Sequence, residues 1–413
     1  MLILREKFLY ASVKNTIFAR FLRPKCIKNA RKSNKKIYYM KLKVSSAALF
    51  GRLTAINRVL NSKNSFPILD CYLFEIADKN MTITASDSET TLVTNVELIQ
   101  SSEDARFCIK AKTIQDSLKE ISDQPITLNV NLDTMEIKGE YQNGSFQIMG
   151  ERADEYPAPH SIDGESHTFE IQQNVLLTGI NQSLFATADD EIRPVMTGIY
   201  FDFTPENLVF VGTDGRKLVR KKDFSVSSEN QVGFILPKKP ATILKSLLNK
   251  GEGTVKLTFN DKQTKLEAPD FTLTCRLIDG RYPNYNSVIP QNNPYLARID
   301  RTVLISALKR VLVFCDQSSA LVKMAFSASK LTVSGQDVSY ATSAEERIAC
   351  EYDSPNMNIG FKGTLLLDIL GNLESSEVIF QLADPGRAGI ITPAEQKEGE
   401  DILMLLMPMM LND

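Results

Sequence analysis

The residue types that most often do chemistry in enzymes are few in this sequence and are not arranged as a catalytic site. Histidine is the commonest general base, and the chain has only His160 and His167, seven residues apart in a polar stretch that we interpret as an exposed linker. Adjacent acids such as Asp189 and Asp190 are interpreted as solvated surface carboxylates. The six cysteines form no CxxC pair, so they predict neither a zinc site nor a redox motif.

The sequence also lacks the short motifs of known active sites. It contains no GxxxxGK[ST] phosphate loop, no GxGxxG dinucleotide fingerprint, no HExxH zinc motif and no GxSxG nucleophile motif. We therefore expect a protein that is not an enzyme and that uses no metal and no cofactor. The alternative, a nuclease-like enzyme, would need a metal-binding carboxylate cluster, and the acids show no such spacing.

Charge is distributed unevenly along the chain. Residues 1–39 hold 11 of the 48 basic residues and one of the 50 acidic ones, which leaves 37 basic against 49 acidic residues in 40–413. A basic, acid-poor segment is typical of transit peptides and of nucleic-acid-binding arms. We favour an upstream start codon instead, because an apolar–polar alternation begins at once with Met40. We therefore treat 1–39 as a basic extension outside the fold.

Size and hydropathy place the rest of the chain among multidomain proteins. A length of 413 residues favours about two to four domains. No apolar run approaches the roughly 18 residues that a membrane span needs, so we expect no membrane partner. Scattered single cysteines fit a reducing compartment, and we expect a cytoplasmic protein.

One pattern occurs three times in residues 40–413. Each copy opens with a strand and an amphipathic helix, continues with a strand–turn–strand unit that runs into an aspartate, and then has a second helix and further short strands. The expected first helices are residues 45–60, 172–186 and 301–314; the aspartates are Asp87, Asp214 and Asp337; the expected second helices are residues 112–121, 238–248 and 362–373. The aspartates are 127 and 123 residues apart, which indicates repeated domains.

The repeat predicts an α+β fold in which two helices of each domain pack on an antiparallel sheet. The expected domains are residues 40–164, 165–294 and 295–413. Proline-containing linkers at 155–159 and 281–285 close the first two copies, because proline stops a preceding strand.

Four segments resemble the bacterial DNA sliding clamps, the family of DNA polymerase III beta subunits. They are FPIL at 66–69, VGTDGRKL at 211–218, LIDGRYPNY at 277–285 and LMPMML at 406–411. The resemblance covers residues 40–411. It implies a homodimeric ring of six domains that encircles double-stranded DNA without sequence preference and acts as a polymerase processivity factor. The alternative is a monomeric three-domain adaptor that binds peptides without encircling DNA.

The resemblance also implies which residues contact the partner subunit and DNA. The expected dimer interface places Phe146 and Ile148 of one chain against Val313 and Phe314 of the other, with Glu345 and Glu346 facing basic groups. The expected DNA contacts are Lys63, Arg193 and Lys238, which match basic positions of the family, and Lys112 and Lys119, which lie on an expected inner helix. Pro194-Val195 replaces an aromatic pair of the family, so we expect no stacking on DNA there.

A third implied site is an apolar groove between the second and third domains. It would bind short extended peptides of the replicative polymerase, the clamp loader and repair proteins. The matching residues are Met196, Thr213, Gly215, Arg216, Lys217, Leu218, Pro283, Val288, Gly386, Ala388, Leu405, Leu406, Met407, Pro408 and Met409. Methionine is flexible and suits a groove with several ligands. Ser287 and Met410 stand where the family carries arginines, and Arg216-Lys217 replaces His-Arg, so we expect a different peptide preference.

Overall fold

The computed structural model describes residues 39–61, 64, 66–158, 161–190, 192–248 and 253–411. The basic extension up to residue 38 lies outside this part of the chain, as do Lys63 and His160. The described residues fold into three α+β repeats, as the sequence predicts. A membrane-spanning helix would need a longer apolar stretch than any helix in this part of the chain has.

Repeat 1 consists of strands β1 to β9 and the helices between them. Its elements are β1 Met40–Ser45, α1 Ser46–Ile56, η1 Asn57–Val59, η2 Pro67–Asp70, β2 Cys71–Ala77, β3 Asn80–Ser86, β4 Thr90–Glu97, β5 Gln100–Ser101, β6 Ala105–Lys110, α2 Ala111–Lys119, β7 Pro125–Asn131, β8 Glu136–Tyr141, β9 Gly144–Met149 and η3 Ala153–Glu155. Helix α1 begins where Ser45 Oγ accepts a hydrogen bond from the Ala48 amide at 3.2 Å.

Repeat 2 consists of β10 to β17. Its elements are β10 His167–Gln172, α3 Gln173–Leu184, η4 Pro194–Met196, β11 Gly198–Phe203, β12 Leu208–Thr213, β13 Lys217–Asp223, β14 Val232–Pro237, α4 Lys238–Leu247, β15 Thr254–Phe259, β16 Gln263–Glu267 and β17 Phe271–Arg276, followed by η5 Tyr285–Val288. His167 opens β10, so its expected place in a linker was wrong; its side chain is exposed.

Repeat 3 consists of β18 to β26. Its elements are β18 Tyr295–Asp300, α5 Arg301–Leu312, β19 Leu321–Ser327, β20 Lys330–Asp337, β21 Thr342–Ala349, β22 Glu351–Tyr352, β23 Met357–Lys362, α6 Gly363–Gly371, β24 Glu377–Leu382, β25 Gly389–Pro393 and β26 Glu400–Leu406. Asp300 caps α5 by accepting the amides of Thr302 and Val303, and these hydrogen bonds lower the pKa of its carboxyl group.

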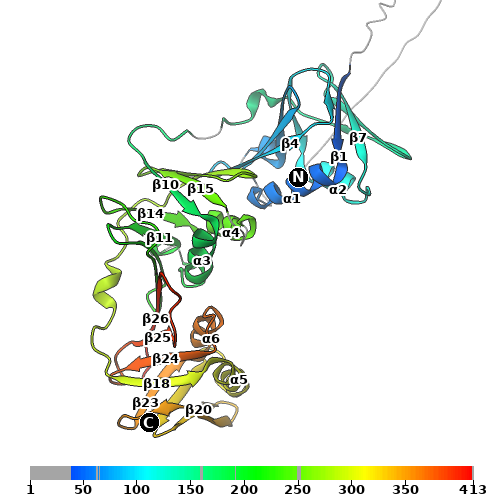
Figure 1. Ribbon diagram of the computed structural model, residues 1–413. Coiled ribbons are helices and arrows are strands. Elements are labelled where there is room, and N and C mark those ends of the chain that lie inside the picture. Colours follow the sequence, from blue (N-terminus) through cyan, green and yellow to red (C-terminus); the bar gives the residue numbers. More distant parts are fainter. Residues whose placement is uncertain are drawn as a thin grey trace, which may run out of the picture. The chain divides into compact units, whose positions relative to one another are not determined.

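The two helices of each repeat lie side by side against its strands (Figure 1). Their apolar faces are closed off from solvent: Leu53 of α1, Leu308 of α5 and Leu366 of α6 are each 0% exposed. Burial of a leucine side chain contributes roughly 1.5–3 kcal/mol, so this helix pairing is a main source of stability in every repeat.

The three aspartates occupy equivalent turns. In Asp87, Asp214 and Asp337 the Oδ1 atom accepts the amides two and three residues further on, at 2.6–3.2 Å. This Asx-type geometry explains why aspartate recurs at the end of the strand–turn–strand unit. The sequence-based equivalence of these three residues is therefore confirmed.

The lysines that introduce the second helices are not equivalent, which corrects the sequence comparison. Lys110 is the N-cap residue of α2 and Lys362 that of α6, whereas Pro237 is the N-cap residue of α4. Counted from these caps, Lys112 matches Lys239 and not Lys238. Lysines lie within two residues of each helix start, so the sequence comparison aligned lysines that hold different positions in the three helices.

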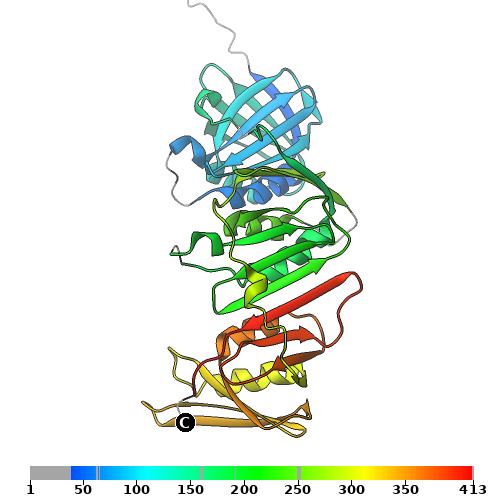
Figure 2. The same ribbon diagram turned by 90° about the vertical axis from the view of Figure 1, so that its left-hand side faces the viewer.

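The sheets do not stop at the repeat boundaries. Strand β17 of repeat 2 pairs antiparallel with β4 of repeat 1, and β26 of repeat 3 pairs antiparallel with β13 of repeat 2. Figure 2 shows the second joint, where the red C-terminal strand runs beside green strands of repeat 2. In both joints the last strand of one repeat meets the fourth strand of the repeat before it, leaving fewer backbone groups unpaired.

Side chains reinforce the joint between repeats 1 and 2. Lys239 at the start of α4 donates hydrogen bonds to the Val59 carbonyl at 2.5 Å, to Asn61 Oδ1 at 2.6 Å and to Asp87. The Asp87 side chain is 5% exposed, so removing this partner would leave a buried carboxylate unpaired. Lys239 of repeat 2 therefore binds three groups of repeat 1.

We expect Lys239→Met to destabilise the chain by about 2 kcal/mol, because it leaves a buried carboxylate without a cation while keeping a side chain of similar length. The measurement is the urea midpoint of unfolding, followed by circular dichroism. Lys245→Met, an exposed lysine of the same helix, is the matched control and should leave the midpoint unchanged. Equal midpoints for the two variants would show that the Lys239 contact adds nothing.

Candidate functional site

An apolar cluster lies on the joint between repeats 2 and 3. Leu218 from β13, Leu405 from β26 and Ala388 beside β25 are its members from the expected groove, and all three are buried. Tyr282 and Tyr285 from the linker after repeat 2 also belong to it, together with apolar residues of the neighbouring strands. The structure therefore brings together residues that are 187 positions apart in sequence, such as Leu218 and Leu405, as a directly paired couple across the sheet.

The joint continues past the end of the sheet into the C-terminal residues. The backbone amide of Met407 donates a hydrogen bond to the Arg216 carbonyl at 2.8 Å. The Met407 side chain is 45% exposed and Val288 of η5 is 56% exposed, so both offer apolar surface to solvent. Both follow buried members of the cluster along the chain, Leu405 and Tyr285, so their exposed side chains are available to a ligand at this joint.

Not every expected groove residue can touch a ligand. Leu406 is 0% exposed and belongs to the core of repeat 3, so it supports the joint and does not line it. Thr213 is buried and its hydroxyl donates to the Lys217 carbonyl at 2.7 Å, which fixes the turn. Met196, Pro283 and Pro408 are half-buried.

Gly386 and Met409 line a different hollow. This hollow, of about 610 Å³, lies on repeat 3 and is also lined by Tyr295, Met357 and Met410. Met409 is fixed there by its amide, which donates to the Gly360 carbonyl at 2.8 Å. The expected groove residues are thus distributed over two neighbouring parts of the surface.

Sequence reasoning missed several residues beside the apolar cluster. Val195, Tyr200 and Ile278 are partly buried and pack against it. The Tyr200 ring stacks on Tyr282 with 4.8 Å between centroids, and Tyr285 donates a hydrogen bond to Asp202 at 2.8 Å. Two signals were available: the alternation of apolar residues in the strand from Gly198, which contains Tyr200, and the segment 277–285, which contains Ile278.

Charged groups surround a buried lysine near this cluster. Lys217 is 6% exposed and pairs with Asp214 at 3.1 Å, with its ammonium group 6.0 Å from the centre of the Phe185 ring. Burial raises the pKa of Asp368 on α6, while the charge of Lys217 acts to lower it. Lys217 therefore serves the joint, whereas Arg216 is exposed to solvent.

Arg193 lies beside the groove turn. Gly215 has a positive φ of 82°, which favours glycine, and a β-carbon there would lie 2.4 Å from Arg193 Nη1. Arg193 also lies 3.5 Å from the Asp190 carboxylate. An expected DNA contact is therefore next to an expected peptide contact.

The other expected DNA contacts differ in their surroundings. Lys238 donates a hydrogen bond to Asp189, and this bond lowers the pKa of that carboxyl group. Lys112 and Lys119 of α2 are exposed and have no ion-pair partner among the described residues. Lys63 lies outside the described part of the chain.

The expected interface residues lie at two sheet edges. Phe146 and Ile148 belong to β9, which ends the five-stranded sheet, and Glu345 and Glu346 belong to β21, which ends the four-stranded sheet. Glu346 accepts two hydrogen bonds from Arg310 within the chain, the longer at 2.7 Å, and Glu345 pairs with Arg347. Each acid thus has a partner inside its own chain.

Val313 and Phe314 follow α5 and are 70% and 41% exposed. Neither side chain is needed to fill the core of repeat 3, so both are available for a contact with another molecule. In the part of the chain that the structure describes, no group of three or more His, Cys, Asp or Glu could hold a metal ion, and the five cysteines there are free and buried.

Three family models match consecutive parts of the chain. They describe the DNA polymerase III beta subunit, with its N-terminal domain at residues 40–160, its central domain at 170–284 and its C-terminal domain at 286–410. Among curated proteins, the beta sliding clamps of Haemophilus influenzae and Synechocystis are 27% and 28% identical to this chain; they cover 88% and 90% of it, and 99% and 100% of their own length.

Solved structures agree with these matches. A sliding clamp from Pseudomonas aeruginosa, bound to griselimycin, superposes with a TM-score of 0.86 at 25% identity, and the match covers 90% of this chain and 100% of that one. The DNA polymerase III beta subunit of Thermotoga maritima gives a TM-score of 0.82 at 25% identity, with the same coverage. The matches support a polymerase processivity factor and not the monomeric adaptor. The chain belongs to the DNA polymerase III beta subunit family, the beta sliding clamps of bacteria.

Proposed function

We propose that two copies of this chain close head to tail into a ring that encircles duplex DNA and tethers a DNA polymerase. The observation that carries the proposal is the way the repeats are joined. Each internal joint uses the last strand of one repeat and the fourth strand of the preceding repeat. The two strands of these kinds left at sheet edges are β9 of repeat 1 and β21 of repeat 3. A second copy can pair them in the same way.

The internal joints also indicate in which register β9 of one subunit would pair with β21 of the other. Residues at the same height in the last strand of each repeat can be identified from their pairing with the strand before it. By this criterion Ile148 of β9 corresponds to Cys275 of β17 and to Leu406 of β26. Cys275 pairs with Thr90 and Leu406 with Lys217, each the third residue after the turn aspartate. The strand after the corresponding turn in repeat 3 begins two residues later, so Ile148 would pair with Thr342.

This register passes a test of side-chain direction. It opposes Phe146 to Ala344 and Gly144 to Glu346. Phe146, Ile148, Ala344 and Glu346 all lie on the less exposed face of their strands, so the apolar Phe146 and Ala344 meet on that face. A shift by one residue would place them on opposite faces. Val313 and Phe314 then add exposed apolar surface to the proposed interface.

We expect the double variant Gln147→Cys, Ser343→Cys to form disulfide-linked dimers on oxidation, because the two positions lie opposite each other on the exposed faces of β9 and β21 in this register. The measurement is non-reducing gel electrophoresis. Gln147→Cys, Thr342→Cys, which is out of register by one residue, is the matched control and should link poorly. Efficient linking by the control alone would refute the register.

We propose that the ring holds DNA by threading. Phosphate contacts are independent of sequence and salt-sensitive, whereas contacts to bases would resist sliding. Exposed lysines on the helices, such as Lys119, Lys245 and Lys309, would supply such contacts, with Lys238 and Arg193 as further candidates. Residues 40–413 carry a net charge of −12, which limits nonspecific adhesion of the outer surface.

Threading predicts that retention depends on the shape of the DNA. After loading by a clamp loader and ATP, the protein should stay on a nicked circular plasmid through gel filtration in high salt and should leave once one restriction cut linearises the plasmid. Adhesion by phosphate contacts would instead give equal, salt-sensitive retention on both forms. Equal retention would contradict encirclement.

We propose that the apolar surface around Met407 and Val288 binds short peptides of the replicative polymerase, the clamp loader and repair proteins. The support is the contrast between a buried cluster that fixes the joint and exposed apolar side chains at its edge. Ser287 and Met410 stand where the family carries arginines and so remove two positive charges, whereas Arg216 in place of histidine adds one. With this net loss of positive charge, acidic peptides would be bound less well than apolar ones.

Griselimycin, which is bound to the Pseudomonas aeruginosa clamp, is a suitable probe for this surface. We expect Met407→Ala combined with Val288→Ala to weaken its binding by about tenfold or more, because truncating central apolar contacts typically costs over 1 kcal/mol each. Both side chains are exposed, so the fold should persist. Leu296→Ala, an exposed leucine in β18, is the control in calorimetry. Unchanged affinity in the double variant would refute the assignment.

The remaining sequence-based expectations are retained as part of the proposal. The chain would act without catalysis, metal or cofactor, and in the cytoplasm, where a DNA polymerase works. Its domains would comprise residues 40–164, 165–294 and 295–413, with the boundaries after the proline-containing linkers at 155–159 and 281–285.

A further inference from the structure

The turn aspartates each use one carboxylate oxygen for the backbone and leave the other for a cation. Asp87 Oδ2 accepts from Lys239 of the next repeat. Asp214 Oδ2 lies 3.1 Å from Lys217 Nζ in its own repeat. Two of the three equivalent sites are therefore occupied by lysine. The source of the lysine differs between them.

The sequence explains that difference. The lysine that binds the aspartate can stand at either of two positions. One is the second residue of the second helix in the next repeat, and the other is the third residue after the aspartate itself. At the joint of repeats 1 and 2 these residues are Lys239 and Thr90, and at the joint of repeats 2 and 3 they are Thr364 and Lys217. Each joint thus has lysine at one of the two positions.

Repeat 3 has the aspartate, but no lysine or arginine of the described residues pairs with it. Asp337 is 6% exposed, its Oδ1 holds the amides of Ser339 and Tyr340, and no ion pair with a described residue involves it. Its third following residue is Tyr340, and the residue equivalent to Thr90 by strand pairing is Thr342, so the local position offers no lysine. A nearly buried carboxylate without a cation is costly.

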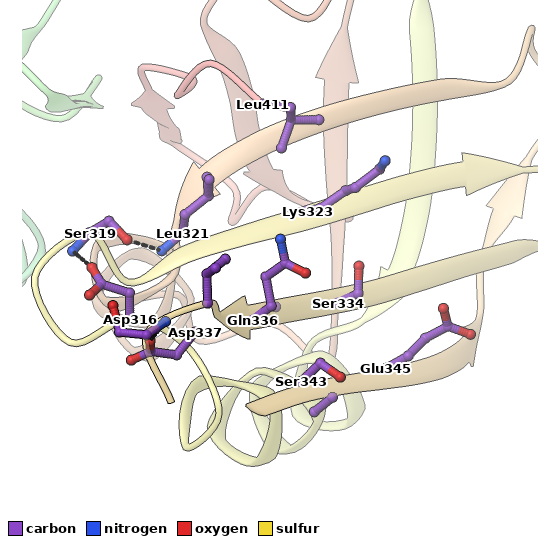
Figure 3. A pocket seen from close by; sticks show the side chains of 14 residues that line it. Asp316, Ser319, Leu321, Lys323, Ser334, Gln336, Asp337, Ser343, Glu345 and Leu411 are labelled. Atoms are coloured by element: carbon purple, nitrogen blue, oxygen red, sulfur yellow. Dashed lines mark hydrogen bonds between the residues drawn. The ribbon is translucent and has the colours of Figure 1, made fainter. Parts of the chain in front are cut away.

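The site opens into a hollow that a side chain could enter. Asp337 lines this hollow, of about 660 Å³, together with Asp316. Figure 3 shows the two carboxylates close together at one end, with Lys323 and Leu411 towards the other end. The Asp316 carboxyl group accepts the Ser319 amide at 2.8 Å, and hydrogen bonds from this segment lower its pKa, which keeps it charged.

Besides Asp87, Lys239 binds the Val59 carbonyl and Asn61, and both have counterparts in repeat 3, namely Phe314 and Asp316. Val59 lies 14 residues after the N-cap Ser45, and Phe314 lies 14 residues after the N-cap Asp300. By the same count Asp316 is equivalent to Asn61. The three groups that bind Lys239, namely a carbonyl, a side-chain oxygen and a carboxylate, therefore all have counterparts in repeat 3, with Asp316 adding a second charge.

We infer that Lys112 of one subunit enters this hollow in the second copy of the chain and binds Asp337, Asp316 and the Phe314 carbonyl. Lys112 is the second residue of α2, the position that Lys239 holds in α4. It is exposed and has no ion-pair partner among the described residues. The inference rests on the proposed ring, because the same head-to-tail step that pairs β9 with β21 brings α2 to this end of repeat 3.

This assignment replaces the expected DNA contact of Lys112 and leaves Lys119 as the DNA-facing lysine of α2. The two are seven residues apart, and both are exposed. A partner lysine relieves the cost of the buried Asp337 carboxylate only in the closed dimer, so the pair favours ring closure.

The test measures dimer dissociation by sedimentation for the full chain and for Lys112→Gln, Asp337→Asn and the double variant. Asparagine keeps the Oδ1 acceptor that holds the turn. We expect each single variant to weaken the dimer by roughly 30-fold, the lower range for breaking a desolvated interfacial charge pair. The double variant should be little weaker than either single one. Lys112→Arg should retain most of the affinity.

Lys119→Gln is the matched control and should leave dimer dissociation unchanged while it weakens salt-sensitive DNA binding. A stable dimer that is indifferent to Lys112→Gln, or additive losses in the double variant, would overturn the Lys112 assignment while leaving the ring intact. A parent chain that stays monomeric at every concentration would overturn the ring itself, so the two failures are distinguishable.

Discussion

Backbone hydrogen bonding between repeats is the constraint on which the rest of the structure depends. A strand at the edge of a sheet leaves N–H and C=O groups unpaired, and proteins cover such edges or pair them. This chain pairs four such strands in two internal joints, β4 with β17 and β13 with β26. Because both joints use the same two strand positions, the chain is left with one edge of each kind. The groove follows from the same constraint, since its buried cluster forms where β13 meets β26.

The sequence predicts the local structure well and the joints poorly. Helical spacing of apolar residues located all six longer helices to within a few residues, because that signal is contained in each segment. The pairing of β4 with β17 joins residues about 180 positions apart, and alternating strands carry no label for their partner. Leu406 and Met407 are both apolar neighbours in sequence, and only the pairing of β26 shows that the first is in the core and the second at the surface.

Charge was the least predictable feature, because the role of a lysine depends on what lies across a joint. Lys238 and Lys239 are neighbours on α4, yet the first binds an exposed acid of its own repeat and the second a buried acid of another repeat. Residues that bind acids are less available to phosphates. A threaded ring tolerates that loss, since its retention depends on closure and not on the strength of each phosphate contact.

Covalent continuity separates the internal joints from the proposed joint between subunits. Strands β4 and β17 share five residue pairs and β13 and β26 share seven, and neither joint has to open. The joint between subunits would have five pairs in the inferred register, yet it must open for DNA to enter. A lysine–carboxylate contact suits that demand, because truncating one partner of such a pair mainly affects the rate of separation. Apolar packing by Phe146 and Phe314 would hold the closed state, and the charge pair would set how readily it opens.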